Sequence, residues 1–183
     1  MSAFHEPVLG EEAVRLLDPR GEGLYLDGTV GGGGHSRRIL ERCSGCRVLA
    51  VDRDVEALER ARVELAEFGS RVRYLHARFD EAPSDPEARA SGLDGALLDL
   101  GVSAHQLREP ARGFSFARGV ALDMRMDATT AMDASRFLSE ASEERLAQVF
   151  RDFGEEPRAR RLAREIVKRR RGSPAWTSDE LVA

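Results

Sequence analysis

Short apolar runs alternate with amphipathic segments through the first hundred residues of the chain. Several of these runs end in an acidic residue, and short continuous apolar runs are typical of buried parallel strands. They predict strands over residues 24–27, 47–52, 72–77 and 93–101. Apolar residues spaced three and four apart predict helices over about residues 11–17, 36–42 and 54–68, whereas residues 83–91 are polar and are expected to be irregular. This alternation predicts an α/β fold with a doubly wound parallel sheet.

The pattern changes after Val102. Residues 103–119 contain proline, glycine and two aromatic residues and are expected to form a long ordered loop, which in a compact domain is usually functional. Residues 122–127 alternate charged and apolar side chains, and helices are expected over 134–138, 142–153 and 156–171. We therefore expect a ligand-binding α/β half over residues 1–108 and a loop with a helical domain over residues 109–183.

Composition excludes some classes of protein. The 183 residues are 42% hydrophobic and 33% charged, which is typical of one globular domain or one domain with an appendage. No apolar run approaches the roughly 20 residues that span a membrane. The N-terminus lacks the basic region and apolar core of a signal peptide. We expect a cytoplasmic protein without a membrane partner.

Basic charge gathers near the end of the chain, although the net charge is −4. Residues 158–171 contain eight basic residues and one acid, Glu165. In a helix, several of these bases share one face, and such a face can neutralise the phosphates of a nucleic acid. A merely solvated face is the other interpretation, and the pattern alone favours it.

Cys43 and Cys46 form a Cys-x-x-Cys pair. A metal site needs a second pair or nearby histidines, and the histidines are scattered, so no metal is expected. A redox pair of this kind begins a helix, whereas this one falls at a helix end, where Gly45 is a stop signal. We expect incidental thiols.

A glycine-rich stretch, residues 27–36, links the first strand to the next helix. Its four consecutive glycines, Gly31 to Gly34, permit positive φ and close approach of a ligand to the backbone. Their spacing differs from the dinucleotide motif and from the phosphate loop of nucleotide hydrolases, which argues against NAD and ATP. Asp52 follows Gly33 by nineteen residues, the place of an acid that binds ribose hydroxyls. A plain glycine-rich turn is the alternative.

Three predicted strands end near an acid: Asp27, Asp52 and Asp99. In a parallel sheet these carboxylates lie on the same rim and favour a cationic ligand such as the sulfonium of S-adenosylmethionine. Phe79 follows the third strand, where an aromatic side chain can cover an adenine face. Strand capping for the acids and core packing for Phe79 are the alternatives.

Several motifs occur in the order found in one family. The chain resembles the ribosomal RNA small subunit methyltransferase H family, the cytosine-N4 methyltransferases of 16S ribosomal RNA. The motifs are His5-Glu6-Pro7-Val8-Leu9, Gly31-Gly32-Gly33-Gly34-His35-Ser36, Val51-Asp52-Arg53-Asp54, Leu97 to Ser103, Arg112-Gly113-Phe114-Ser115-Phe116 and Leu122 to Asp127. The segment from Phe150 to Arg164 is similar too, so the likeness runs over nearly the whole chain.

The resemblance implies a Rossmann-like, class I S-adenosylmethionine-dependent methyltransferase with an α-helical insertion domain. Its partner would be 16S rRNA within the small ribosomal subunit, and a homodimer is also expected from the resemblance. The residues that it implies for the cofactor are Gly33, Gly34, His35, Asp52, Phe79, Asp99 and Gln106. The residues expected to contact the substrate are Arg112, Phe114, Asp123 and Arg125.

Two loops depart from the family pattern. The family usually has Ser-Ser-Pro-Gln where this chain has Ser103-Ala104-His105-Gln106, and Asp-Gly-Pro-Leu-Asp where it has residues 118–123. Both loops keep the residues expected to matter, Gln106 and Asp123, so activity is expected to survive.

Family members are longer, and their sheet resumes after the helical insertion. This chain ends at Ala183, within the expected insertion, so the sheet is expected to be truncated and its fourth strand to be an exposed edge. A non-catalytic fragment that binds S-adenosylmethionine is therefore one alternative, and a methyltransferase for another nucleic-acid amine is a second. For catalysis, Asp99 and the backbone of residues 100–101 are expected to accept the protons of the cytosine amine, with Asp123 as the second candidate.

Overall fold

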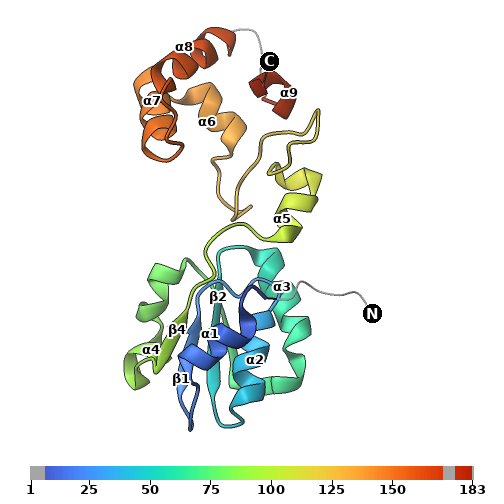
Figure 1. Ribbon diagram of the computed structural model, residues 1–183, viewed down its shortest axis with the longest axis vertical. Coiled ribbons are helices and arrows are strands. Elements are labelled where there is room, and N and C mark those ends of the chain that lie inside the picture. Colours follow the sequence, from blue (N-terminus) through green and yellow to red (C-terminus); the bar gives the residue numbers. More distant parts are fainter. Residues whose placement is uncertain (1–6, 171–175, 183) are drawn as a thin grey trace. The chain divides into compact units, whose positions relative to one another are not determined.

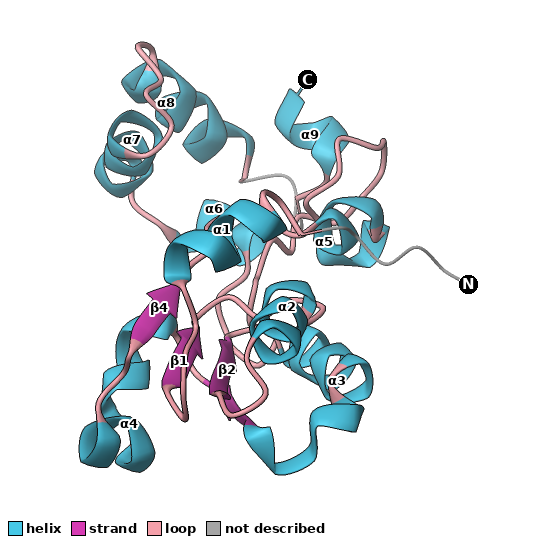
Figure 2. Cartoon of the chain, turned by 60° about the horizontal axis from the view of Figure 1, so that its bottom comes forward, coloured by secondary structure: helices cyan, strands magenta, loops and turns pink. Residues whose placement is uncertain are grey.

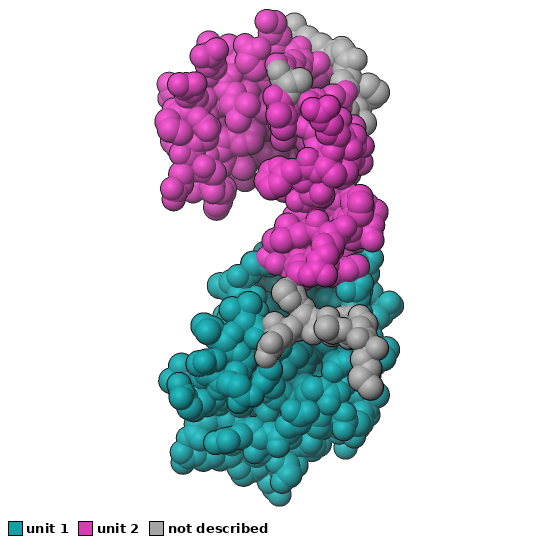
Figure 3. All heavy atoms as spheres, turned by 45° about the vertical axis from the view of Figure 1, so that its right-hand side comes forward, with its two compact units in different colours: residues 1–101 teal, residues 102–183 magenta. Residues whose placement is uncertain are grey.

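The structure is a computed structural model that describes residues 7–170 and 176–182. The chain divides into two compact units, residues 1–101 and 102–183, coloured separately in Figure 3. The observed division lies seven residues before the boundary expected at residue 108, because the short helix α5 (Ala104–Arg108) belongs to the second unit. Each unit is described by itself.

The first unit is built on a parallel sheet with strand order β3-β2-β1-β4. This is the order of the first four strands of a Rossmann fold, so the predicted α/β fold is confirmed. The sheet (Figure 1) comprises β1 (Leu24–Asp27), β2 (Arg47–Asp52), β3 (Val72–His76) and β4 (Gly95–Leu97). The helices are α1 (Gly10–Leu17), α2 (Gly34–Arg42), α3 (Val55–Glu64) and α4 (Pro86–Ser91), with 3-10 turns η1 (Ala66–Arg71) and η2 (Phe79–Ser84).

Helices cover both faces of this sheet. Figure 2 shows α2 and α3 on one side of the strands and α4 on the other. Alternate strand residues enter two core clusters: Tyr25, Val48 and Ala50 pack with α1, α2 and α3, whereas Leu24 and Leu49 pack with η2 and α4. The two-residue period of a strand therefore explains why these runs are apolar throughout.

Some predicted elements of this unit were wrong in extent or type. Residues 83–91 are largely helical rather than irregular, because the Asp85 carboxylate accepts the backbone N–H groups of Glu87 and Ala88, and Pro86 opens α4. The helix expected to reach residue 68 ends at Glu64 and continues as the turn η1. The fourth strand shrinks to residues 95–97, since β1 offers only a short partner.

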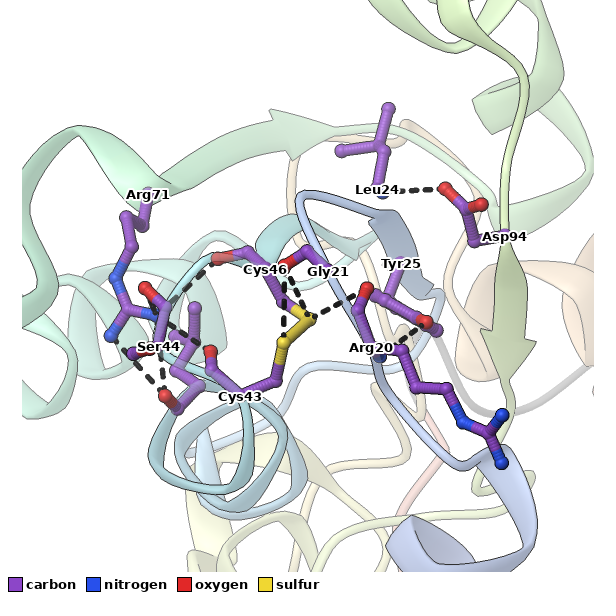
Figure 4. The surroundings of a disulfide bond; sticks show 10 residues. Arg20, Gly21, Leu24, Tyr25, Cys43, Ser44, Cys46, Arg71 and Asp94 are labelled. Atoms are coloured by element: carbon purple, nitrogen blue, oxygen red, sulfur yellow. Dashed lines mark hydrogen bonds between the residues drawn. A yellow bond between two sulfur atoms is a disulfide. The ribbon is translucent and has the colours of Figure 1, made fainter.

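The two cysteines form a disulfide, which corrects the expectation of incidental thiols. Figure 4 shows Cys43 and Cys46 at the C-terminal end of α2, beside the backbone of Gly21. The guanidinium of Arg71 donates to the carbonyls of Cys43 and Ser44, 3.0 Å away in each case. The disulfide and this arginine together close the helix end, where backbone carbonyls lack helical partners.

The second unit contains helices around its own core. They are α5, η3 (Pro110–Arg112), α6 (Ala134–Glu140), α7 (Glu143–Asp152), α8 (Ala159–Arg169) and α9 (Ser178–Val182). The core joins Leu138, Leu146, Ala163, Ile166 and Trp176, among others. The predicted helical domain is present, although α8 begins three residues after the predicted start, and Arg171 lies outside the described residues. Among the described residues, no helix is long and apolar enough to cross a bilayer.

Candidate cofactor and substrate site

The glycine-rich loop lies between the end of β1 and the start of α2. Its backbone is tied to both neighbouring strands, because Gly28 N–H donates to the Leu97 carbonyl and Val30 N–H donates to the Val51 carbonyl, each at 3.0 Å. Gly33 has φ +90°, and a Cβ added there would lie 3.1 Å from Leu65 Cγ. Only glycine fits this position without strain, so the loop is an ordered part of the fold.

The side chain of Asp27 stabilises this loop. Its side chain is completely buried, one oxygen accepting the Ser36 hydroxyl at 2.7 Å and the other the Thr29 N–H at 3.3 Å. Burial raises the pKa of this carboxyl above its usual range. Three carboxylates were expected to face a ligand at this rim. Asp27 is not one of them, because its side chain points into the protein.

Asp52, at the end of β2, contacts the loop directly. One carboxylate oxygen accepts the Gly31 N–H and the other accepts the Asp54 N–H, both at 2.9 Å. Burial raises the pKa of Asp52 as well. The side chain is only partly buried. Its hydrogen bond with Gly31 joins the glycine loop to the end of β2.

Asp99 and Phe79 also contact the glycine loop. The Asp99 N–H donates to the Thr29 hydroxyl at 2.7 Å, and the residue itself is exposed two positions after β4. Phe79 opens η2 and is 40% exposed. A Cβ built on Gly28 would lie 2.9 Å from the Phe79 Cβ, so this residue packs against the start of the loop. The structure thus gathers Asp52, Phe79 and Asp99 around one loop.

His35 contacts the segment before α1 rather than an open space. Its ring is buried, and Nε2 lies 3.1 Å from the Val8 carbonyl oxygen. Gly34 is crowded by Pro7, whose atoms would lie 3.2 Å from an added Cβ. Any contact of His35 with a cofactor therefore falls to its backbone N–H, in the first turn of α2, where N–H groups lack helical partners.

Gln106 lies in the second unit, at the third position of α5. Its side-chain oxygen accepts the Ser103 N–H at 2.9 Å, while the Ser103 hydroxyl accepts the Gln106 N–H at 3.1 Å. This reciprocal pair is a capping box. Ala104 and His105, which depart from the family pattern, lie between the two capping residues and leave the box intact.

Three of the four expected substrate residues hold the loop that carries them. Arg112 is buried, and its guanidinium donates to the carbonyls of Arg125 and Met126 at 3.0 and 2.9 Å. Asp123 and Arg125 form a two-pronged ion pair at 2.6 and 2.9 Å. Hydrogen bonding to that arginine lowers the pKa of Asp123. A contact of these three with a substrate stays a prediction.

The two aromatic residues of this loop differ in exposure. Phe114, the expected substrate residue, is partly buried, whereas Phe116 is 99% exposed. Near Phe116 the backbone is held by the Ser178 hydroxyl, which donates to the Ala117 carbonyl at 2.6 Å. Within the described part of the chain, no group of three or more His, Cys, Asp or Glu residues is placed to hold a metal ion.

Comparison with known proteins decides the family. The model of the MraW methylase family matches residues 2–183. The chain belongs to the MraW methylase family. Proteins named ribosomal RNA small subunit methyltransferase H align over the whole chain: that of Heliobacterium modesticaldum is 48% identical over 100% of the chain, and that of Beutenbergia cavernae is 44% identical over 99%.

The chain spans 59% of the Heliobacterium relative and 56% of the Beutenbergia relative. The MraW methylase match includes the motif around Pro7, of which His5 and Glu6 lie outside the described residues. Sequence reasoning placed Asp52, Phe79 and Asp99 at the loop but missed Thr29 and Val8, which contact Asp99 and His35. A threonine inside a glycine loop was the available signal for the first, whereas nothing local marked the second.

Proposed function

We propose that this chain carries the cofactor-binding part of an enzyme that methylates the N4 amine of a cytidine in 16S ribosomal RNA, with S-adenosylmethionine as methyl donor. The observation that carries the proposal is the glycine loop bound to Asp52, adjoining Phe79 and Asp99, in a chain of the MraW methylase family. The relatives' names supply the ribosomal RNA of the small subunit.

The residues present fit this cofactor. A Cβ on Gly31 would meet only the Thr29 carbonyl oxygen, at 3.9 Å, so the backbone here is open to a ligand. The Asp52 carboxylate is suited to ribose hydroxyls, and the partly exposed Phe79 ring is suited to an adenine face. Bound S-adenosylmethionine supplies a methyl group already activated by a sulfonium.

The protein's own contribution is to orient and desolvate the cytosine amine. The nitrogen lone pair is delocalised into the ring, so the amine must be held in line with the methyl group at near-attack distance. Positive charge then develops on nitrogen, and an acceptor for its N–H groups lowers the barrier. The target base must also leave its stack to reach a pocket.

Asp99 is the acceptor that the site favours. Its carboxylate is exposed beside the loop, while its backbone is fixed by the Thr29 hydroxyl. Asp123, the second candidate, is engaged by Arg125, which lowers its pKa and makes it a weaker base. The proposal accordingly gives the Asp99 carboxylate the role of proton acceptor, while the neighbouring backbone carbonyls accept hydrogen bonds from the amine.

The partner in this proposal is 16S rRNA within the small ribosomal subunit, and the place of action is the cytoplasm. The expected homodimer stays a prediction. A non-catalytic S-adenosylmethionine-binding fragment is the second candidate function. A methyltransferase for another nucleic-acid amine is the third.

Calorimetry with S-adenosylmethionine tests the cofactor site. Asp52→Asn replaces one acceptor oxygen by an NH₂ group, so the side chain can no longer accept the N–H groups of both Gly31 and Asp54 and loses its negative charge. We therefore expect the Kd to rise at least tenfold. Asp18→Asn is the matched control, because Asp18 is exposed and precedes β1. Equal affinities of the two variants would refute the assignment of Asp52.

Transfer of a labelled methyl group separates the three functions. The same protein sample is incubated with small ribosomal subunits, naked 16S rRNA and DNA. Turnover on the ribosomal substrates that is lost in Asp99→Asn, even at a cofactor concentration that saturates the variant, supports the proposal. Binding without turnover supports the fragment, and turnover on DNA supports the third function. Normal turnover of Asp99→Asn would remove Asp99 from the mechanism.

A further inference from the structure

Helix α8 has two opposed faces. Ala159, Ala163 and Ile166 are buried in the core of the second unit, where α8 packs against α7 (Figure 1). The opposite side carries four exposed bases, which we call the α8 basic face: Arg160, Arg161, Arg164 and Lys168. At 3.6 residues per turn these four positions fall within an arc of about 100°.

Three of the four charges of the α8 basic face have no ion-pair partner within the described part of the chain. Arg160, Arg161 and Lys168 form no ion pair with a described residue, and Arg164 approaches Glu143 only to 3.6 Å. Glu165, the one acid on the helix, lies about 40° beyond the arc. The face therefore presents three uncompensated positive charges and a fourth, that of Arg164, which is paired with Glu143.

Many arginines elsewhere in the chain are paired with acidic residues. Arg37 pairs with Glu41, Glu64 and Glu67, and several exposed arginines each have an acidic partner: Arg20, Arg78, Arg136 and Arg151. The chain is acidic as a whole, with a net charge of −4, so acids were available for pairing. What distinguishes α8 is that several bases share one arc of a single helix.

Such an arrangement does not serve helix stability. Like charges four residues apart, as in Arg160, Arg164 and Lys168, repel one another on a helix. The first turn of α8 contains no acid to offset them. A row of phosphates outside the helix would neutralise these charges and release counterions, which is how basic faces gain affinity for nucleic acids.

We propose that the α8 basic face binds the phosphate backbone of the ribosomal RNA and positions it for methylation. The inference rests on the proposed function and adds a docking surface to it. From Arg160 to Lys168 the helix rises about 12 Å, enough to reach more than one phosphate of an RNA strand. Contacts to phosphate fix register and orientation without reading sequence.

The experiment measures binding of a fluorescently labelled RNA hairpin, containing the target cytidine, between about 50 and 400 mM salt. The variant is the triple substitution Arg160→Gln, Arg161→Gln and Lys168→Gln. The matched control, Arg20→Gln, Arg136→Gln and Arg151→Gln, removes the same charge from paired surface arginines. The logarithm of the association constant falls as the logarithm of the salt concentration rises. We expect the magnitude of this slope to decrease by about two in the variant and by less than one in the control.

Several outcomes would overturn the proposal. An unchanged slope means a solvated face, and equal changes in both triple variants mean that only net charge matters. Displacement of the RNA by polyglutamate at the same charge concentration favours an acidic protein partner. If circular dichroism shows that the triple variant unfolds, Arg161→Gln and Lys168→Gln are measured singly, each with an expected slope change of about 0.7 to 0.9.

Calorimetry with S-adenosylmethionine on the same samples keeps the two proposals apart. The triple variant is expected to bind the cofactor like the parent chain, because α8 shares no residue with the glycine loop. Failure of the parent chain to bind cofactor or to transfer a methyl group would refute the proposed function. A normal cofactor Kd with an unchanged RNA salt slope would refute only the role of the α8 basic face.

Discussion

A buried carboxylate under the glycine loop, Asp27, makes the fold sensitive to pH. Its folded pKa is raised by burial, so the folded state binds more protons than the unfolded chain between the two pKa values. The free energy of unfolding therefore falls as pH rises through that window, because the folded protein must bury a charge. Hydrogen bonds from Ser36 and Thr29 offset part of this penalty.

Asp27→Asn removes this titration while keeping an oxygen to accept the Ser36 hydroxyl. We expect the melting temperature of the variant, relative to the parent chain, to increase from about pH 4 upward and to level off above the folded pKa of Asp27. Thermal melts by circular dichroism at half-unit intervals measure this difference. A difference that is constant with pH would mean that folding does not raise the pKa of Asp27.

Single residues also show what sequence reasoning can reach. Asp52 and Asp99 were predicted at the site because the carboxyl ends of parallel strands share one rim, and that rule needs only strand positions. The direction of the Asp27 and His35 side chains was not predictable, because it depends on Ser36 and Val8, which pack beside them only after folding. The position of each residue could be predicted from the pattern of strands, whereas the partner of its side chain could not.

Elements were predictable where burial decides them. The bounds of β1 and β2 agree with the predicted ones, since both strands are buried on two faces and are apolar except at their ends. Helix α4 was missed because it has little apolar periodicity and depends on capping by Asp85. The disulfide was missed because the approach of two cysteines at a helix end depends on how α2 finishes.

The turn that joins β1 to α2 supports a prediction at this scale. Gly33→Ala forces a side chain into left-handed backbone and towards Leu65, and we expect a loss of about 1–2 kcal/mol in the free energy of unfolding. We also expect the Kd for S-adenosylmethionine to rise at least tenfold, because the turn presents the backbone to the ligand. Chemical denaturation and calorimetry measure the two effects.

Gly21→Ala is the matched control. Gly21 has φ +60° and open space around its Cβ position, so the same backbone strain arises outside the glycine loop. We expect a similar loss of stability with an unchanged cofactor Kd. Equal losses of affinity in both variants would show that general destabilisation, rather than the shape of the loop, governs binding.

At the scale of the whole molecule, the two units have separate hydrophobic cores. The clusters around Ile39 and Leu49 contain only residues of the first unit, and the cluster around Leu146 contains only residues of the second. The pattern of the sequence anticipated this, because strand-like runs stop near residue 101 and helical periodicity follows. The exact boundary was not predictable, since α5 has a helical pattern that fits either unit.

Separate cores predict separate responses to core damage. Leu146→Ala empties a fully buried position in the second unit, and Leu49→Ala does the same in the first. Each should cost about 2–5 kcal/mol in the stability of its own unit, because buried leucine truncation loses both transfer energy and packing. Only Leu49→Ala should weaken binding of S-adenosylmethionine, since the sheet that it disturbs carries the glycine loop.

Amide hydrogen exchange locates the damage: protection should fall in the second unit for Leu146→Ala and in the first unit for Leu49→Ala. Loss of protection throughout the chain in both variants would show instead that the two cores unfold as one cooperative unit.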